Sequence, residues 1–277
     1  MLEDRPRSSI PADHSRWMAL FAVVLGLAGC VGAPNQRTDD TPQRTTASDQ
    51  TDADRRARVR LELAAAYFGR GQSETALDEV KKALTANPDF AEAYNLRGLI
   101  YASLGEDRLA DESFHRALQL KPGDGDTLHN YGWFLCQQRR FEPAQQQFTQ
   151  ALAQTQYRSQ TRTWLAQGVC QARAGQLPEA EKSLVRAYEA DPASPVTAVN
   201  LAEVLYRQGE YQRARFYIAR VNAVPEQSSA QTLWLALRIE HKLGDQERQR
   251  QLSTELRGRF PQAPETLALE RGRFDDE

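Results

Sequence analysis

Residues that could carry out chemistry are few and widely separated in this chain. Three cysteines occur without a CxxC pair or a metal-ligand spacing: Cys30, Cys136 and Cys170. Four histidines occur without a second ligand nearby: His14, His115, His129 and His241. There is no P-loop, GxSxG or GxGxxG motif, and no nucleophile is accompanied by a base. We therefore expect no catalytic residue, metal, cofactor or small-molecule substrate, and a binding protein rather than an enzyme.

The composition describes a globular, helical protein with no strong charge. Hydrophobic residues make up 40% of the 277 residues, which is enough for a core. The 35 Lys and Arg residues nearly balance the 37 Asp and Glu residues, giving a net charge of -2. Such a balance provides no overall field to attract nucleic acid, so we expect no nucleic-acid partner. Ala, Leu, Gln, Glu and Arg dominate over Val and Ile, which favours helices.

Cys30 ends the tetrapeptide LAGC, which follows an apolar run over residues 17–27. The run has the length of a signal-peptide core and is too short to span a bilayer. The tetrapeptide resembles the bacterial lipobox, in which cleavage exposes an N-terminal cysteine that is then acylated. We predict a lipoprotein signal peptide over 1–29 and lipidation of Cys30. An ordinary signal peptide with a chance cysteine is the alternative.

A polar segment follows the cysteine. Residues 32–56 contain no Leu, Ile, Val, Met or aromatic residue, so they cannot bury enough apolar surface to offset the entropy of ordering. We predict that 30–56 form the lipidated cysteine and a flexible tether. Because Val31 rather than Asp follows the cysteine, the resemblance to lipoproteins implies an anchor on the periplasmic face of the outer membrane.

A period of 34 residues organises the rest of the chain. Gly71 and Gly105 are 34 residues apart, and the same spacing separates Ala83 from Ala117. The pattern looks like the tetratricopeptide repeat, and residues 91–124 fit it best. One repeat is a helix pair that cannot bury its apolar face alone, so the pairs must stack.

We predict an all-α, right-handed superhelical solenoid of about six helix pairs over 57–262. The expected units are 57–90, 91–124, 125–160, 161–194, 195–229 and 230–262. The third unit carries an insertion around residues 156–160, and the sixth is degenerate, as a terminal cap should be. The polar segment 263–277 is expected to be a loose tail or a short helix.

The first helix of each repeat contributes the residues that face the concave groove of such stacks. These positions give an apolar surface with asparagines, suited to an amphipathic helix or an extended peptide. The candidate partner-binding residues are Phe68, Asn95, Leu99, Asn130 and Trp133. Other residues at or near these positions are Leu61, Ala65, Ala102, His129, Cys136, Leu165, Val169, Asn200 and Tyr206. Trp133 is either an exposed anchor or packing between helices, and the sequence leaves both open.

The same register places Cys136 and Cys170 on adjacent helices. Cys136 holds position 12 of the first helix in the third unit, and Cys170 holds position 10 in the fourth. Neighbouring helices lie about 8–10 Å apart, and two residues of offset add only about 3 Å along the axis. We therefore predict a disulfide between them, since Cys30 is acylated and the compartment is oxidising. Two reduced cysteines in the core are the alternative.

Residues 128–138, which read LHNYGWFLCQQ, are more specific than a general repeat. They resemble the NNYGWFLC signature of the PilF/PilW family of type IV pilus biogenesis lipoproteins, with His129 in place of the first asparagine. Further matches are the run Gly168-Val169-Cys170 and the segment 257–261. The lipobox, the repeat number and the length agree with that family.

The family resemblance implies a function that composition and periodicity do not show. The members are outer-membrane pilotins, which help the type IV pilus secretin to reach the outer membrane and to multimerise there. The chain is therefore expected to bind a secretin without catalysis. The alternative is a general scaffold lipoprotein for outer-membrane or cell-wall enzyme complexes, which would share the anchor and the repeats but lack the 128–138 signature.

Overall fold

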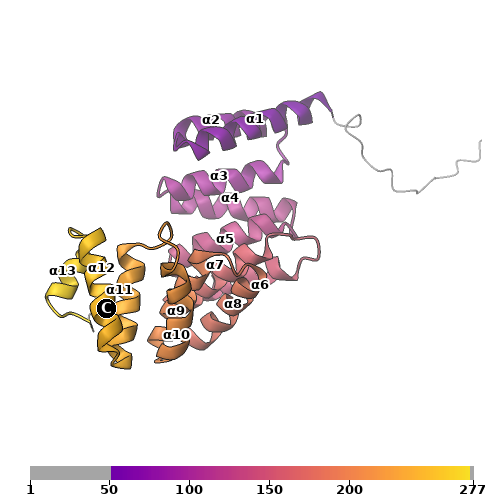
Figure 1. Ribbon diagram of the computed structural model, residues 1–277. Helices are drawn as coiled ribbons and strands as arrows, with labels where there is room; N and C mark the ends of the chain where they lie inside the picture. The colour runs from indigo at the N-terminus through magenta and orange to yellow at the C-terminus, as the bar shows by residue number, and fades with distance from the viewer. Residues whose placement is uncertain (1–50, 275–277) are drawn as a thin grey trace, which may run out of the picture. The chain divides into compact units, whose positions relative to one another are not determined.

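The computed structural model describes residues 51–274, which form thirteen α-helices and no strands (Figure 1). The helices that begin the six pairs, called the A helices below, are α1 (Asp52–Gly69), α3 (Ala91–Ser103), α5 (Gly125–Gln137), α7 (Gln160–Arg173), α9 (Pro195–Arg207) and α11 (Ala230–Leu243). Their partners, the B helices, are α2 (Ser73–Ala86), α4 (Asp107–Leu120), α6 (Phe141–Ala153), α8 (Leu177–Ala190), α10 (Tyr211–Asn222) and α12 (Gln246–Arg259). The predicted all-α repeat fold of six pairs is confirmed, and a short helix, α13 (Pro264–Glu270), follows them.

The two helices of each pair are joined by a short turn that contains one residue with a left-handed backbone. Five of these residues are glycines with φ between +73° and +81°: Gly71, Gly105, Gly175, Gly209 and Gly244. Glycine suits this position because it has no Cβ to crowd the following carbonyl. The third turn uses Arg139 instead, at φ +58°. The Arg139 side chain is exposed, and its backbone conformation costs about 1–2 kcal/mol relative to an ordinary helical one.

Small residues allow the two helices of a pair to approach closely. A Cβ added to Gly98 would lie 2.8 Å from the ring of Phe114, and one added to Gly132 would lie 2.9 Å from the ring of Phe148. Real Cβ atoms essentially never come this near, so an alanine would force the ring to move. The aromatic ring of the B helix therefore fills the space that the missing side chain leaves on the A helix.

Successive pairs stack through both layers of helices. Each A helix contacts the A helix of the next pair, and each B helix contacts the A helix that follows it. Alanines without solvent exposure lie at these junctions, among them Ala83, Ala117, Ala151 and Ala187. Their small size lets the helix axes come together, and the core runs through the stack as a series of hydrophobic clusters.

The insertion in the third unit has a packing role of its own. Tyr157 lies in the loop between α6 and α7, and its ring covers the first residue of α5, Gly125. A Cβ on Gly125 would lie 2.5 Å from that ring. Tyr157 also packs in a small cluster with Leu128 and Ala151. The insertion thus places the aromatic side chain of Tyr157 in the junction between the third and fourth pairs.

The first helix of the stack begins earlier than expected, and the last segment takes one of its two expected forms. The first helix begins at Asp52, within the segment expected to be a tether that ends at residue 56, because Thr51 and Asp54 form a capping box. The Thr51 hydroxyl accepts from the Asp54 amide at 3.1 Å, and the Asp54 carboxylate accepts from the Thr51 amide at 3.3 Å. At the other end, the segment from residue 263, expected to be a loose tail or a short helix, forms the short helix α13, whose Leu269 is buried in the last cluster.

Candidate functional site

The asparagines predicted to line the groove come together in the structure. Asn95 on α3 and Asn130 on α5 are half-buried, and the Asn130 Nδ2 donates a hydrogen bond to the Asn95 Oδ1 at 3.1 Å. Within residues 51–274, the Nδ2 of Asn95 and the Oδ1 of Asn130 have no protein partner. This pair can therefore offer a donor and an acceptor side by side, which matches the needs of a peptide backbone.

Trp133 lies on the same helix as Asn130 and is only partly covered. Its ring packs against the cluster that contains Phe134, and Leu99 packs against the same cluster from α3. The guanidinium of Arg173, on α7, lies 5.4 Å from the centre of the Trp133 ring. The sequence left open whether Trp133 is an exposed anchor or packing between helices. The structure shows a half-buried indole with a cation against its face. Such a side chain combines apolar contact area with access from solvent.

Phe68 does not join this group. It lies on α1 and packs with Leu61 and Tyr67 in a cluster that joins the first pair to α3, whereas Leu99 and Trp133 pack against a different cluster. The structure therefore brings together four of the five predicted groove residues: Asn95, Leu99, Asn130 and Trp133. We call these four, with Arg173, the A-helix site.

His129 was predicted at a groove-facing position, and that prediction is wrong. Its side chain is 7% exposed and lies inside the junction between α5 and α7. The Thr163 hydroxyl lies 2.8 Å from His129 Nδ1 and 2.7 Å from the Tyr157 hydroxyl, so the three groups form one buried network. Burial, and secondarily the charge of Arg162, lower the pKa of His129 to about 4. His129 is therefore neutral near pH 7, and its side chain packs in the junction between α5 and α7 and does not line a groove.

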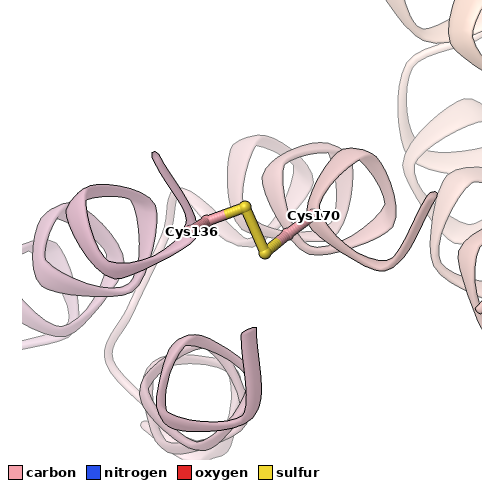
Figure 2. Close-up of a disulfide and its surroundings, with 2 residues drawn as sticks. All are labelled: Cys136 and Cys170. Carbon is pink, nitrogen blue, oxygen red and sulfur yellow. A yellow bond between two sulfur atoms is a disulfide. The ribbon is translucent and has the colours of Figure 1, made fainter. Parts of the chain in front are cut away.

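Cys136, also predicted at a groove-facing position, is only 1% exposed and is joined to Cys170 by a disulfide (Figure 2). The bond links α5 to α7, with the two Cα atoms 5.8 Å apart, and both residues are buried. It lies in the same hydrophobic cluster as Phe134 and Trp133. The covalent link therefore holds the two helices that carry Trp133 and Arg173 in a fixed relation.

Two arginines on the A helices were not singled out from the sequence. Arg173 ends α7 and Arg207 ends α9, and the Arg207 guanidinium donates to the Ala172 carbonyl at 3.1 Å. Both stand at position 13 of their units, one of the groove-facing positions. That shared position was the signal available in the sequence. The guanidinium groups of Arg173 and Arg207 add positive charge beside the apolar and asparagine side chains of the A helices.

Within residues 51–274, no three His, Cys, Asp or Glu side chains are grouped so that they could hold a metal ion. None of the helices in this part of the chain is both long and apolar enough to cross a membrane.

The sequence of this chain is similar to repeat families and to proteins of known name. Four segments match tetratricopeptide-repeat families, at residues 64–105, 91–124, 135–195 and 171–236. The chain is 28% identical to the type IV pilus assembly protein PilF of Pseudomonas aeruginosa over 243 residues, which cover 87% of this chain and 92% of that protein. It is also 32% identical over 108 residues to an uncharacterised protein of Haemophilus influenzae, covering 39% of this chain and 60% of that protein.

Solved structures agree with the sequence comparison. The crystal structure of PilW, described as a widely conserved type IV pilus biogenesis factor, is 29% identical with a TM-score of 0.72. The match covers 77% of this chain and 98% of PilW. The structure of Pseudomonas aeruginosa PilF superposes with a TM-score of 0.70 at 24% identity, covering 80% of this chain and all of that one, and shows the same fold.

Proposed function

Because this chain is a tetratricopeptide-repeat protein homologous to the type IV pilus proteins PilF and PilW, we propose that it is a pilotin. In this role it is a non-enzymatic lipoprotein of the outer membrane that binds the type IV pilus secretin. Binding promotes the localisation of the secretin to the outer membrane and its multimerisation there. The observation that carries the proposal is similarity to a pilus assembly protein along nearly the whole length of both chains.

The A-helix site supports a peptide as the bound part of the secretin. The Asn95–Asn130 pair offers a backbone donor and acceptor, and Leu99 with Trp133 offers apolar contact. Partly buried aromatic side chains are frequent hot spots of protein interfaces. Arg173 adds a cation that can pair with an acidic side chain of the partner. A polypeptide segment with an apolar side and an acidic residue fits this chemistry.

Replacing Trp133 or Asn130 by alanine is expected to weaken capture of the secretin. If the side chains are hot spots, the loss is about 1–2 kcal/mol or more, which corresponds to roughly a 5- to 30-fold higher Kd. The measurement is the affinity of the purified chain for the secretin, together with the yield of secretin multimers in outer membranes. Phe216→Ala is the matched control, because Phe216 is an exposed aromatic residue on α10, a B helix. Normal melting of Trp133→Ala together with normal capture and multimer yield would show that the site is elsewhere.

The lipid anchor is a second part of the proposal. It concerns Cys30 and the preceding residues 1–29, which lie outside the described residues, as does most of the proposed tether. Cys30→Ala is expected to abolish incorporation of labelled palmitate, because the cysteine sulfur is the nucleophile to which the diacylglyceryl group becomes attached. Val31→Asp is the companion variant, since it should keep the label while moving the protein from outer to inner membranes. Palmitate labelling that is unchanged in Cys30→Ala would exclude lipidation at this residue.

A further inference from the structure

The chain after α13 folds back onto the last A helix. Gly272 turns the backbone at φ +66°, and Phe274 then reaches α11, where it packs with the last hydrophobic cluster. The Phe274 ring is stacked on Trp234, with centroids 5.4 Å apart, and on His241, with centroids 4.4 Å apart. The Nε of Arg238 donates to the backbone carbonyl of Phe274 at 3.2 Å. Three side chains of one helix thus hold both the ring and the backbone of this residue.

Trp234 and Arg238 stand where α3 carries Asn95 and Leu99, and His241 lies about one turn further along the same helix. Trp234, Arg238 and His241 are the fifth, ninth and twelfth residues of α11, counted from Ala230. Asn95 and Leu99 are the fifth and ninth residues of α3, and Trp133 is the ninth residue of α5. The face of α11 that holds Phe274 is therefore equivalent, by position in the repeat, to the face that carries the A-helix site.

The contact has the character of a binding site rather than of a core. Phe274 and Trp234 are half-buried and His241 is exposed, so the stacked rings are open to solvent. Arg238 also lies over the ring of Tyr206 on α9, 4.4 Å from its centre, which joins the site to the neighbouring A helix. A guanidinium that donates to a backbone carbonyl oxygen, beside rings stacked on the side chain, holds one residue by both its backbone and its side chain, as a site for a peptide residue must.

We propose that this face of α11 is a second docking position of the peptide groove, for an aromatic side chain of the bound partner, and that the chain's own Phe274 occupies it as a tethered ligand. The proposal rests on the peptide-binding function proposed above and adds the kind of residue that is recognised. The partner must displace Phe274 from Trp234 and His241. Because a short link gives a tethered ligand an effective concentration of about millimolar, the occupied site lowers the apparent affinity for the partner.

A peptide with the sequence of residues 271–277 (RGRFDDE) tests this proposal with the chain's own segment as the probe. The peptide is added to the intact mature chain and to its Phe274→Ala variant, and the indole N–H signal of Trp234 is followed by NMR. We expect the variant to bind the peptide at least ten-fold more tightly than the unchanged protein, in which Phe274 already fills the site. The control peptide RGRADDE, which lacks the aromatic ring, should leave the Trp234 signal unmoved.

The possible outcomes separate this proposal from the proposed function. No movement of the Trp234 signal in Phe274→Ala at millimolar peptide would overturn it, as would equal binding by both proteins or by both peptides. Adding Trp234→Ala to the variant should remove binding, as measured by anisotropy of a labelled peptide. If that protein melts cooperatively and still binds, the site is not on α11. Because the secretin is absent from these experiments, their result does not depend on whether it is the physiological partner.

Discussion

Phe148→Ala is expected to lower the free energy of unfolding by about 3–5 kcal/mol, the range observed when a buried phenylalanine is truncated. Phe148 on α6 has no solvent exposure. Its ring lies against Gly132 of α5, so closely that no Cβ would fit between them. Tyr157 and the disulfide tie α5 to the neighbouring junction, which limits how far this helix can move into the space. The substitution therefore leaves a cavity in the third pair.

Phe216→Ala makes the same chemical change on another B helix and serves as the control. Phe216 on α10 is 55% exposed, so its truncation should change the free energy of unfolding by less than about 0.5 kcal/mol. Urea unfolding followed by circular dichroism measures both variants against the unchanged chain. Similar losses for the two variants would show that the Phe148 ring is not buried against Gly132.

Removing the disulfide is expected to destabilise the chain by about 3–4 kcal/mol in the chain-entropy model. The bond closes a loop with a sequence separation of 34 residues, and its loss gives that freedom back to the unfolded chain. The double variant Cys136→Ala, Cys170→Ala tests this without leaving a buried hydroxyl. For a protein of this size, the melting temperature should fall by roughly ten degrees.

Thiol chemistry provides the control for that experiment. The Cys30→Ala protein, unfolded without a reductant, should show no free thiol, since its two remaining cysteines are joined. A reductant should lower the melting temperature of the Cys30→Ala protein. It should leave unchanged the melting temperature of the variant in which Cys30, Cys136 and Cys170 are all replaced by alanine. Two free thiols in unfolded protein taken from the periplasm would contradict the bond.

The repeat architecture could be predicted because its determinants are local and recur every 34 residues. Five turn glycines, the close contact of Gly98 with Phe114, and the pairing of Cys136 with Cys170 all follow from that register. The departure at Arg139 could not be given a conformation from sequence, because a periodic pattern assigns a position but not the φ angle of an atypical residue. The structure shows that the turn is kept there at a cost in backbone energy.

The errors occur where residues outside the period decide the environment. His129 holds a groove-facing position in the pattern, but Thr163 and the inserted Tyr157 enclose it. The number of inserted residues could be counted from the sequence. The direction in which the Tyr157 side chain points could not be predicted from it. Phe274 was missed for a related reason: it follows the last repeat, so no register connects it to Trp234 and His241.

Contacts within residues 51–274 join each helix pair only to the next one, and the chain end only to the last pair. Local opening at one end therefore removes no contact at the other, and the array behaves as a one-dimensional system in which terminal units fray first. The first pair has a neighbour on one side only, so its amides should exchange with solvent sooner than those of the middle pairs. The bond between α5 and α7 couples the third and fourth pairs, which makes them the most cooperative block of the array. The A-helix site lies largely on that block, so it keeps its geometry while the ends of the stack open and close.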